Sequence, residues 1–433
     1  MSSKILQKAL ITTLLIAALM VPSCLLTNLV KERENIQQQA TQEAGQKWAT
    51  PQVFAGPYIS VPYTGKDQHT GHVLLLPQQL NVHSELQTEE RSRSIYKIMF
   101  YRTQLTVNGN FLLQKPTQIP LELLDLSKAS LCIGLSDRKG IEEKMAITVN
   151  GKNYDFQPGL PDNKLQLPGL SVAFPLTTAS FDSAFPFNMT AHFKGSGQLH
   201  FAPLSANSSF TMASAWPSPS FDGNTLPVSR SVTDKGFSAT WKFNQANLPF
   251  TASIVHETPE LKHILFGVSI VKPADQYAKT MRTIKYSLLV ISLTFALFFI
   301  LELLQKKPVH PIQYVLVGLA LIVFYTLLLS ASEFIDFDLA YVLSAVATIL
   351  LITLYVKGHF KTWKTAGIFT ATLAVLYSYL FCIIRLEDTA LLVGSIGLFM
   401  ILAVIMFLSQ RINWYKLDAP AKDHSSAHPE PTI

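Results

Sequence analysis

Six long apolar runs constrain this chain more than any other feature of its sequence. The first run, 9–30, follows Lys8 and contains no charged residue. A helix needs about 20 apolar residues to cross the ~30 Å hydrocarbon core of a bilayer, so this run is long enough. Five more runs of similar length follow at 286–304, 312–330, 339–356, 366–384 and 390–409. We therefore predict six transmembrane helices, an N-terminal anchor and a five-helix C-terminal bundle.

The composition agrees with a membrane protein. Hydrophobic residues make up 48% of the chain and charged residues 15%, and the mean hydropathy is +0.26. Ordinary soluble proteins are less apolar and more highly charged. The net charge of +6 does not predict a nucleic-acid partner, because no Lys/Arg-rich run or zinc-finger spacing accompanies it. Much of the excess lies beside the apolar runs, so the lipid bilayer is the expected partner.

The basic residues of the short loops alternate between the two sides of the membrane. On the side of the N-terminus lie nine Lys and Arg residues: two before the first run, two and three in the loops after the second and fourth, and two after the last. The two other short loops carry only Arg385. Because Lys and Arg are retained in the cytoplasm, residues 1–8 and the tail 410–433 are predicted to be cytoplasmic and residues 31–285 to lie outside. The tail is expected to be disordered from Asp418 onwards.

The first run also resembles a secretory signal. Residues 21–24 (VPSC) weakly match a lipoprotein cleavage site, and the preceding segment has signal-like charge and length. Pro22 at the second position of this site and the apolar residues that continue beyond Cys24 argue against cleavage. We therefore expect 9–30 to be an uncleaved anchor.

The long segment between the first and second runs has the composition of a soluble domain. Ala, Gln and Glu dominate 31–50, which predicts a helical linker. In 237–243 apolar and polar residues alternate, as is typical of a strand with one buried face. Asn150-Gly151 predicts a hairpin turn, and Asn108-Gly109 suggests a second one. We therefore predict a large all-β, antiparallel, sandwich-like domain over 51–285.

Few residues of this domain suggest catalysis or metal binding. His69, His72 and His83 could ligate zinc, but no Cys or His-Glu motif frames them, and solvated loop histidines are the favoured interpretation. The sequence contains no nucleophile elbow, phosphate-binding loop or dinucleotide fingerprint. We therefore expect no catalytic residue, no metal and no cofactor.

Several ionisable residues lie within or between the C-terminal runs. Glu302 is inside 286–304, where an ionisable group is a functional hypothesis by default. Lys306 follows one turn later, so snorkelling or an ion pair between the two is the favoured explanation. The acidic residues of the outer loops are expected to be solvated, and the alternative is a vestibule that attracts cations. These are Glu333, Asp336, Asp338, Glu387 and Asp388.

Short motifs are spread in order over nearly the whole chain. They are KER at 31–33, GPYISVPY at 56–63, SDRKGI at 136–141, WPSPSFDGNTLP at 216–227 with GF at 236–237, PADQY at 273–277, HPIQYVLVGLA at 310–320, SE at 332–333 and INWY at 412–415. Together they resemble the CreD family of inner-membrane proteins of Gram-negative bacteria. The resemblance implies control by a two-component system, and a role in envelope stability, colicin tolerance and β-lactam responses. It implies no catalytic mechanism.

The aromatic and proline residues of 216–227 predict a structural corner, and His310-Pro311 predicts the start of a helix. Both motifs could instead mark a contact surface between the soluble domain and the bundle. The candidate interaction or structural residues are Trp216, Pro217, Phe221, Gly223, Trp241, His310, Tyr314 and Glu333.

Two functions remain open at this point. The first is a non-enzymatic envelope protein whose outer β domain binds an envelope component or a protein partner. The second is a membrane transporter or membrane enzyme that uses the bundle. The second places Tyr314, Tyr325, Glu333 and Asp338 near one aqueous entrance.

Overall fold

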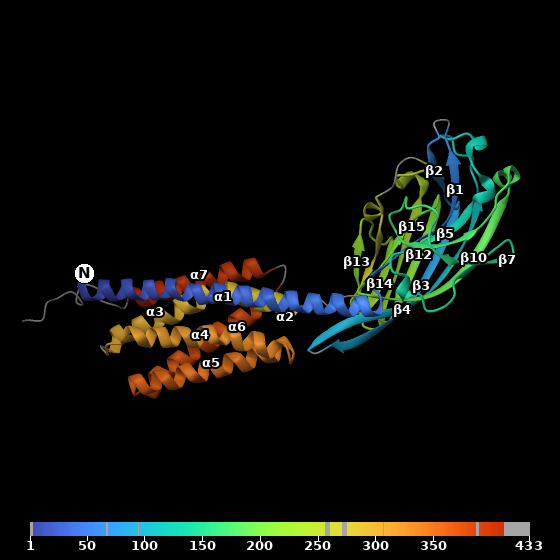
Figure 1. Ribbon diagram of the computed structural model, residues 1–433. Coiled ribbons are helices and arrows are strands. Elements are labelled where there is room, and N and C mark those ends of the chain that lie inside the picture. Colours follow the sequence, from blue (N-terminus) through green and yellow to red (C-terminus); the bar gives the residue numbers. More distant parts are fainter. Residues whose placement is uncertain are drawn as a thin grey trace, which may run out of the picture. The chain divides into compact units, whose positions relative to one another are not determined.

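The computed structural model describes residues 3–65, 68–93, 95–255, 260–270, 275–305, 307–386 and 389–410 (Figure 1). The chain forms two compact units. The helical unit contains residues 1–35 and 274–433, and the β unit contains residues 36–273.

The helices of the structure are few and long. The first, α1, is one continuous helix of 46 residues that includes the predicted anchor and all but the last two residues of the predicted linker. The bounds are α1 Ser3–Trp48, α2 Asp275–Lys285, α3 Ser287–Gln305, α4 Pro311–Ser332, α5 Phe337–Phe360, α6 Trp363–Arg385 and α7 Ala390–Gln410.

Four of these helices, α1, α4, α5 and α6, are long and apolar enough to cross a membrane. The pair α2–α3, bent by 42° between its two helices, passes the same test together and raises the number to five. Within the described residues of α7, only the shorter stretch Leu392–Ala403 is recognised as apolar. Several spanning helices are therefore present, and the count of six stays a prediction.

The exposure of apolar side chains on these helices suits a bilayer. On α5, Leu350 and Leu354 are 56% and 60% exposed, and on α6 Val375 is 70% exposed. Inside the unit, Leu19 of α1 lies directly on Gly318 of α4. A Cβ atom at position 318 would be 2.2 Å from Leu19 Cδ1. Small residues allow this close approach between membrane helices.

The β unit is built from two sheets, which we call sheet A and sheet B. Sheet A has nine strands. They are β1 Gln52–Thr64, β2 Thr70–Leu75, β5 Ser130–Leu135, β8 Gln157–Pro158, β9 Gly169–Ala173, β11 Gln198–Ala202, β13 Ser220–Gly223, β16 Ser253–Ile254 and β17 Phe266–Ser269. The main order is β13-β17-β11-β1-β5-β9-β8, while β2 pairs with β1 and β16 with β2.

Sheet B has eight strands, in the order β14-β15-β12-β3-β4-β10-β6-β7. They are β3 Gln79–Arg93, β4 Tyr96–Leu112, β6 Ala146–Val149, β7 Lys152–Asp155, β10 Ala184–Ser196, β12 Asn207–Ser214, β14 Ser229–Thr233 and β15 Gly236–Asn244.

The two sheets share one aromatic core. Phe210 of sheet B contacts Phe201 and Phe266 of sheet A, with ring centroids 5.4 Å and 4.9 Å apart. Trp241 of sheet B is fully buried, and its ring lies 5.3 Å from that of Phe266. Aromatic residues bury large areas and dominate the energetics of such cores. A large, sandwich-like β domain is therefore present.

Two local predictions for the β domain, one strand and one hairpin, are confirmed. In β15, Phe237, Ala239, Trp241 and Phe243 are buried and the intervening residues are more exposed, so the predicted alternation is confirmed. The hairpin at Asn150-Gly151 is also confirmed: it joins β6 to β7, and both residues have positive φ.

Two expectations about the β domain are wrong. Asn108-Gly109 is not a turn, because β4 runs straight through it between β3 and β10. Position 109 requires glycine because a Cβ atom there would clash with the carbonyl oxygen of Gln79, at a distance of 2.1 Å. The sheets are also not purely antiparallel, since β1 pairs with β11 and β3 with β12 in parallel. Parallel pairs need long crossovers, and these join strands far apart in the sequence.

Candidate functional site

The end of α1 and the start of β1 form a hydrogen-bonded junction within the β unit. Ala49 is fully buried, and its carbonyl oxygen accepts a hydrogen bond of 2.8 Å from the Ser196 hydroxyl. The Lys139 ammonium group donates to the carbonyl oxygen of Gln46 at 3.3 Å. The last carbonyl groups of a helix have no partner inside the helix, so they need such donors. Side chains of the β unit therefore hold the end of α1.

Asp137 binds the backbone immediately after α1. Its carboxylate accepts hydrogen bonds from the Thr50 amide at 2.9 Å and the Thr50 hydroxyl at 3.1 Å. A third bond comes from the Lys139 amide at 3.0 Å. Burial raises the pKa of Asp137, but these hydrogen bonds and the Lys139 charge outweigh burial and lower the pKa below its usual value. The carboxylate is charged at neutral pH, so its hydrogen bonds are of the stronger, charge-assisted kind.

Ser136 and Gln52 extend this network. The Ser136 hydroxyl accepts a hydrogen bond of 2.9 Å from the Val53 amide. Gln52 is fully buried, and its Nε2 donates to the carbonyl oxygens of Asp137 at 3.0 Å and of Lys194 at 3.2 Å. A buried amide side chain is costly unless it is paired, and this one is paired to two other segments of the sandwich. The first residues of β1 are therefore held by side-chain bonds in addition to the sheet.

Gly140 makes the close packing of this network possible. A Cβ atom at this position would lie 2.4 Å from Nε2 of Gln52 and 2.4 Å from the Lys194 carbonyl oxygen. Any side chain here would displace the Gln52 amide. Asp137 and Gly140 both belong to the motif SDRKGI, to which the sequence analysis assigned no role.

Trp48, the last residue of α1, lies among three basic side chains. Arg91, Lys194 and Arg102 lie 4.2 Å, 4.4 Å and 5.1 Å from the centroid of its ring. The ring of Phe100 is 5.5 Å away. Cation–π contacts at partly exposed sites contribute about 0.5–1 kcal/mol each. These contacts and the network around Asp137 together form what we call the α1–β1 junction. It consists of residues 46–53 with Arg91, Phe100, Arg102, Ser136, Asp137, Lys139, Lys194 and Ser196.

A second polar site, the Glu302 cluster, lies inside the helical unit. Glu302 is 6% exposed and forms an ion pair with Lys8 of α1. The Tyr314 hydroxyl donates to its Oε2 at 3.1 Å, and the Val309 amide donates to its Oε1 at 3.1 Å. The expected pair with Lys306 lies outside the described residues, but the snorkelling interpretation is wrong, because the carboxylate is buried among partners. Glu302 therefore binds α1 to the bundle.

A third site, the Glu333 cluster, also joins α1 to the bundle. The Glu333 side chain is 8% exposed, and its Oε1 accepts a hydrogen bond of 3.3 Å from the Tyr277 hydroxyl. Nε of Arg33, on α1, lies 3.9 Å from the same oxygen. The expectation that Glu333 is solvated is wrong, because α1 and α2 cover it. Each of the two clusters contains a Glu and a Tyr from the C-terminal part of the helical unit and one basic residue from α1.

Two of the other acidic residues between the C-terminal helices, Asp336 and Asp338, have structural partners. Asp336 caps α5 by accepting a hydrogen bond of 2.9 Å from the Asp338 amide, and Asp338 forms an ion pair with Arg385. Glu387 and Asp388 lie outside the described residues.

The proposed aqueous entrance is also not assembled as expected. Tyr314 lies near the start of α4 and Glu333 directly after its end. Nineteen residues of helix separate the two by about 28 Å at 1.5 Å per residue. Tyr325 is fully buried between them. These residues therefore cannot line one opening.

The motif at 216–227 is a structural corner, as predicted. The Trp216 Nε1 donates to the Ser218 carbonyl oxygen at 2.8 Å, and Pro217 beside it is exposed. The Phe221 ring lies 6.0 Å from that of Trp241, whose Nε1 donates to the Thr225 carbonyl oxygen at 3.1 Å. The corner places β13 at the edge of sheet A.

Gly223 ends β13 with a φ of +91°, where a Cβ would be 2.3 Å from the Leu265 carbonyl oxygen. The sequence analysis missed Asp222 beside it. Its carboxylate contacts Nε2 of His200 at 2.6 Å and accepts a hydrogen bond from the Ser269 hydroxyl. Burial raises the pKa of Asp222, but the bonds to His200 and Ser269 outweigh burial and lower it. The Asp222 carboxylate therefore links the edge strand β13 to β11 and β17 of sheet A.

His310 begins α4, as predicted. Its Nδ1 accepts a hydrogen bond of 3.3 Å from the Ile312 amide, and its own amide donates to the Gln313 side chain at 3.1 Å. Pro311 occupies the first helical position, which suits its fixed φ. His310 is therefore a helix cap.

His72 is not a solvated loop residue. Its Nδ1 lies 3.0 Å from the Ser60 hydroxyl, which also donates to Oδ2 of Asp162 at 2.5 Å. Burial lowers the pKa of His72. Ser60 is fully buried and its hydroxyl lies between the other two groups, so the set lacks the order and access of a Ser-His-Asp triad. Within the described residues, no group of three or more His, Cys, Asp or Glu side chains is placed to hold a metal ion.

Comparison with known proteins identifies the family. The family model described as inner membrane protein CreD matches residues 4–415. The chain belongs to the CreD family. It is 31% identical over 416 residues to inner membrane protein CreD of Escherichia coli strain K12, covering 93% of this chain and 92% of that protein. The family resemblance found in the sequence is thus confirmed, and the chain is a multi-pass inner-membrane protein.

A solved structure from Legionella pneumophila, described as a putative nutrient binding protein, is also similar to part of the chain. It shares 10% sequence identity, covers 48% of this chain and 71% of its own, and has a TM-score of 0.27. At this TM-score the similarity supports no conclusion about fold or function.

Proposed function

We propose that this CreD family member is a non-enzymatic envelope integrity protein that responds to a component of the cell envelope. Its β domain lies in the periplasm and binds an envelope component or a protein partner. On binding, the β domain is displaced, and helix α1 transmits this displacement to the bundle. The response contributes to colicin tolerance and envelope stability. The full chain crosses the membrane six times, with both termini in the cytoplasm.

The α1–β1 junction is the observation that carries this proposal. A membrane anchor alone needs only a flexible connection to its soluble domain. Here the two residues after α1 are instead held by side chains of the β unit, Ala49 by Ser196 and Thr50 by Asp137, and Trp48 lies among three cations. Because this connection is held by hydrogen bonds, a displacement of the β domain moves α1 with it, whereas a flexible connection would bend. At 1.5 Å per residue, the 46 residues of α1 extend about 69 Å, enough to carry that displacement through a bilayer.

The contacts of α1 in the helical unit support the same role. Lys8 and Arg33 pair with Glu302 and Glu333, and Leu19 lies on Gly318 between them. A displacement of α1 therefore changes two buried carboxylates of the bundle at once.

The experiment uses the full-length protein in its native membrane. Photo-crosslinking residues are placed at exposed positions of the β unit, and captured partners are identified by mass spectrometry. We expect Asp137→Ala to keep the captured partner and to lose the colicin tolerance phenotype, because binding persists while the junction is loosened. If no envelope component is captured at any position, or if Asp137→Ala behaves as the wild type in both assays, the proposal is wrong.

The proposed topology has a separate test. Periplasmic and cytoplasmic reporters are fused after Thr362 and after Asp388, which the six-span arrangement places on opposite sides of the membrane. Reporter activity in the same compartment at both positions would contradict six spans. A fusion after Thr233, in the β domain, serves as the periplasmic reference.

The buried Glu302 also supports a second candidate function, a transporter that uses the bundle, because ionisable groups inside membrane helices often line substrate or proton paths. The two functions differ in their response to Glu302→Gln. A transporter loses activity when the titratable group is removed. An envelope sensor in which Glu302 only binds α1 keeps its function if Lys8→Gln is added, since this double variant restores neutral pairing.

A further inference from the structure

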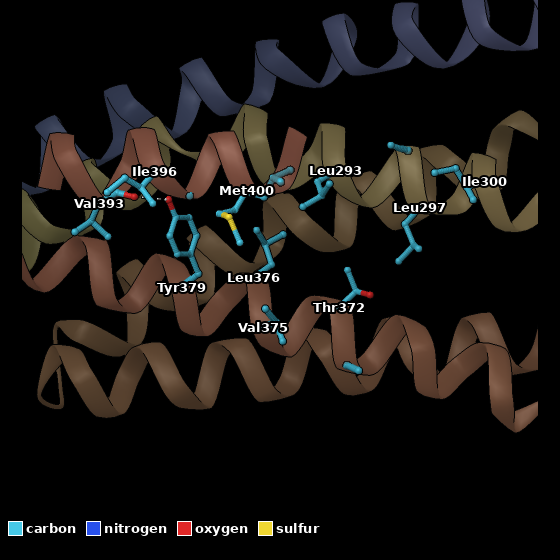
Figure 2. A pocket seen from close by; sticks show the side chains of 14 residues that line it. Leu293, Leu297, Ile300, Thr372, Val375, Leu376, Tyr379, Val393, Ile396 and Met400 are labelled. Atoms are coloured by element: carbon cyan, nitrogen blue, oxygen red, sulfur yellow. Dashed lines mark hydrogen bonds between the residues drawn. The ribbon is translucent and has the colours of Figure 1, made fainter. Parts of the chain in front are cut away.

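A half-open apolar cavity lies between α3, α6 and α7, at the surface of the helical unit. Its volume is about 720 Å³, and Figure 2 shows the side chains that line it. Pockets of about 300–1,000 Å³ accommodate small molecules or parts of them. The walls include Leu297 and Ile300 of α3, Val375 and Leu376 of α6, and Ile396 and Met400 of α7. Almost every group that an occupant would meet is hydrocarbon.

The two hydroxyl groups of the wall are already engaged. The Tyr379 hydroxyl donates to the carbonyl oxygen of Val393 at 3.1 Å or of Gly394 at 3.2 Å. The Thr372 hydroxyl donates to the Ile368 carbonyl oxygen at 2.9 Å. A polar occupant would therefore find no donor in this wall, and burying its polar groups unpaired costs free energy.

Small residues create the width of the cavity. Ala296 on α3, Ala371 on α6 and Gly397 on α7 all line it. Figure 2 shows Tyr379 near one end and Ile300 near the other. Along α6, the lining extends from Ala371 to Tyr379, which is about 12 Å at 1.5 Å per residue. The cavity is thus an elongated slot within apolar helices, and its lining residues Val375, Met400 and Ile396 are 70%, 59% and 55% exposed, so it is open to the surface of the unit.

We propose that this slot binds one acyl chain of a membrane phospholipid. The slot opens toward the medium that surrounds an inner-membrane protein, and that medium is lipid. Its apolar walls, satisfied hydroxyls and elongated shape match a single hydrocarbon chain. A transmembrane helix of a second copy has a diameter of about 10 Å and would pack across the mouth instead of filling the slot.

The test uses the full-length protein in vesicles of phosphatidylethanolamine and phosphatidylglycerol. A trace of phospholipid carries a diazirine in the middle of one acyl chain, and labelled residues are identified by mass spectrometry. We expect the peptide containing Met400 to be labelled several-fold more than the lipid-facing surface of α5 around Leu350 and Leu354. Ala371→Phe fills the slot and should lower the Met400 labelling several-fold.

Ile368→Phe is the matched control. Ile368 lies on α6, is 49% exposed and does not line the slot, so this variant should label as the wild type does. If Ala371→Phe fails to fold, Ala296→Phe fills the slot from α3. Labelling at Met400 no stronger than on α5, or unchanged when the slot is filled, would overturn the proposal. Stronger labelling by an isoprenoid probe than by the phospholipid would also overturn the proposal. The same holds for efficient crosslinking between two copies of the Met400→Cys variant through the new cysteine.

Discussion

The α1–β1 junction leads to a quantitative prediction for Asp137. Its carboxylate accepts two backbone N–H bonds, from Thr50 and Lys139, and one hydroxyl bond from Thr50. Hydrogen bonds to a charged group contribute about 1.5–3 kcal/mol each. Because the two backbone bonds share one side chain and water can replace part of them, we expect Asp137→Ala to lower the local opening free energy by about 2–4 kcal/mol.

Hydrogen exchange of the full-length protein measures this loss directly. At about 1.4 kcal/mol per factor of ten, exchange of the Thr50 and Lys139 amides should accelerate by about 30-fold to about 700-fold in Asp137→Ala. Asp137→Asn keeps one acceptor oxygen and should show about half of this free-energy loss. Peptides covering 49–53 and 137–140 report the effect. The core strand β15 should exchange as in the wild type.

Asp155→Asn is the matched control, because Asp155 also accepts a bond, from Lys144 at 2.6 Å, but both side chains are largely exposed. Such surface pairs contribute about 0–1 kcal/mol, so exchange around Thr50 should not change. Unchanged exchange in Asp137→Ala, or equal acceleration in Asp155→Asn, would refute the role of the junction.

The pH dependence has a definite sign. The folded state lowers the pKa of Asp137, so its contribution is complete above the unfolded pKa of about 3.9 and is lost as the pH falls through the lower folded value. Protection of the Thr50 amide, corrected for intrinsic exchange, should therefore be constant above pH 5 in the wild type.

Three further predictions concern other parts of the molecule. Glu302→Gln removes the ion pair with Lys8, and we expect amides at the start of α1 to exchange about tenfold faster, measured in detergent by hydrogen exchange. Trp241→Ala empties a fully buried site and should lower the free energy of unfolding of the β unit by about 3–5 kcal/mol, measured by chemical denaturation. Gly223→Ala strains a residue with φ of +91° and moves a Cβ against Leu265, so the melting temperature of the β unit should fall, while Gly367→Ala, in open space on α6, should leave it unchanged.

Local sequence signals account for the features that the sequence predicted well. Each apolar run lies, to within one residue, inside α1 or one of the helices α3–α7, because hydropathy over a span length is a property of one segment. The turn at Asn150-Gly151 is similarly local. The same dipeptide at 108–109 failed because β3 and β10 flank it, and nothing near it in the sequence encodes those neighbours.

The functional contacts could not be predicted for the same reason. Thr50 and Asp137 are 87 positions apart, and Lys8 and Glu302 are 294 apart. Only indirect signals were present: in SDRKGI an Asp precedes a Gly by three residues, which is typical of a turn, and Glu302 is a carboxylate inside an apolar run. Neither signal identifies the partner.

The Glu302 and Glu333 clusters contact α1 at two distant residues, Lys8 and Arg33. This spacing determines the free energy that a displacement of α1 would cost. Lys8 and Arg33 are 25 residues apart, about 38 Å of helix, which exceeds the ~30 Å hydrocarbon core. Their side chains are 43% and 45% exposed and can be rehydrated when the pairs break, but the carboxylates of Glu302 and Glu333 are only 6% and 8% exposed and would be left buried without these partners. Because one continuous helix carries both, a shift by one turn must break the two pairs together and lift Leu19 off Gly318. Breaking a buried ion pair costs about 3–5 kcal/mol, so the shift costs about 6–10 kcal/mol, and a ligand of nanomolar affinity, about 12 kcal/mol, has enough binding free energy to shift α1 if most of it depends on the shifted state.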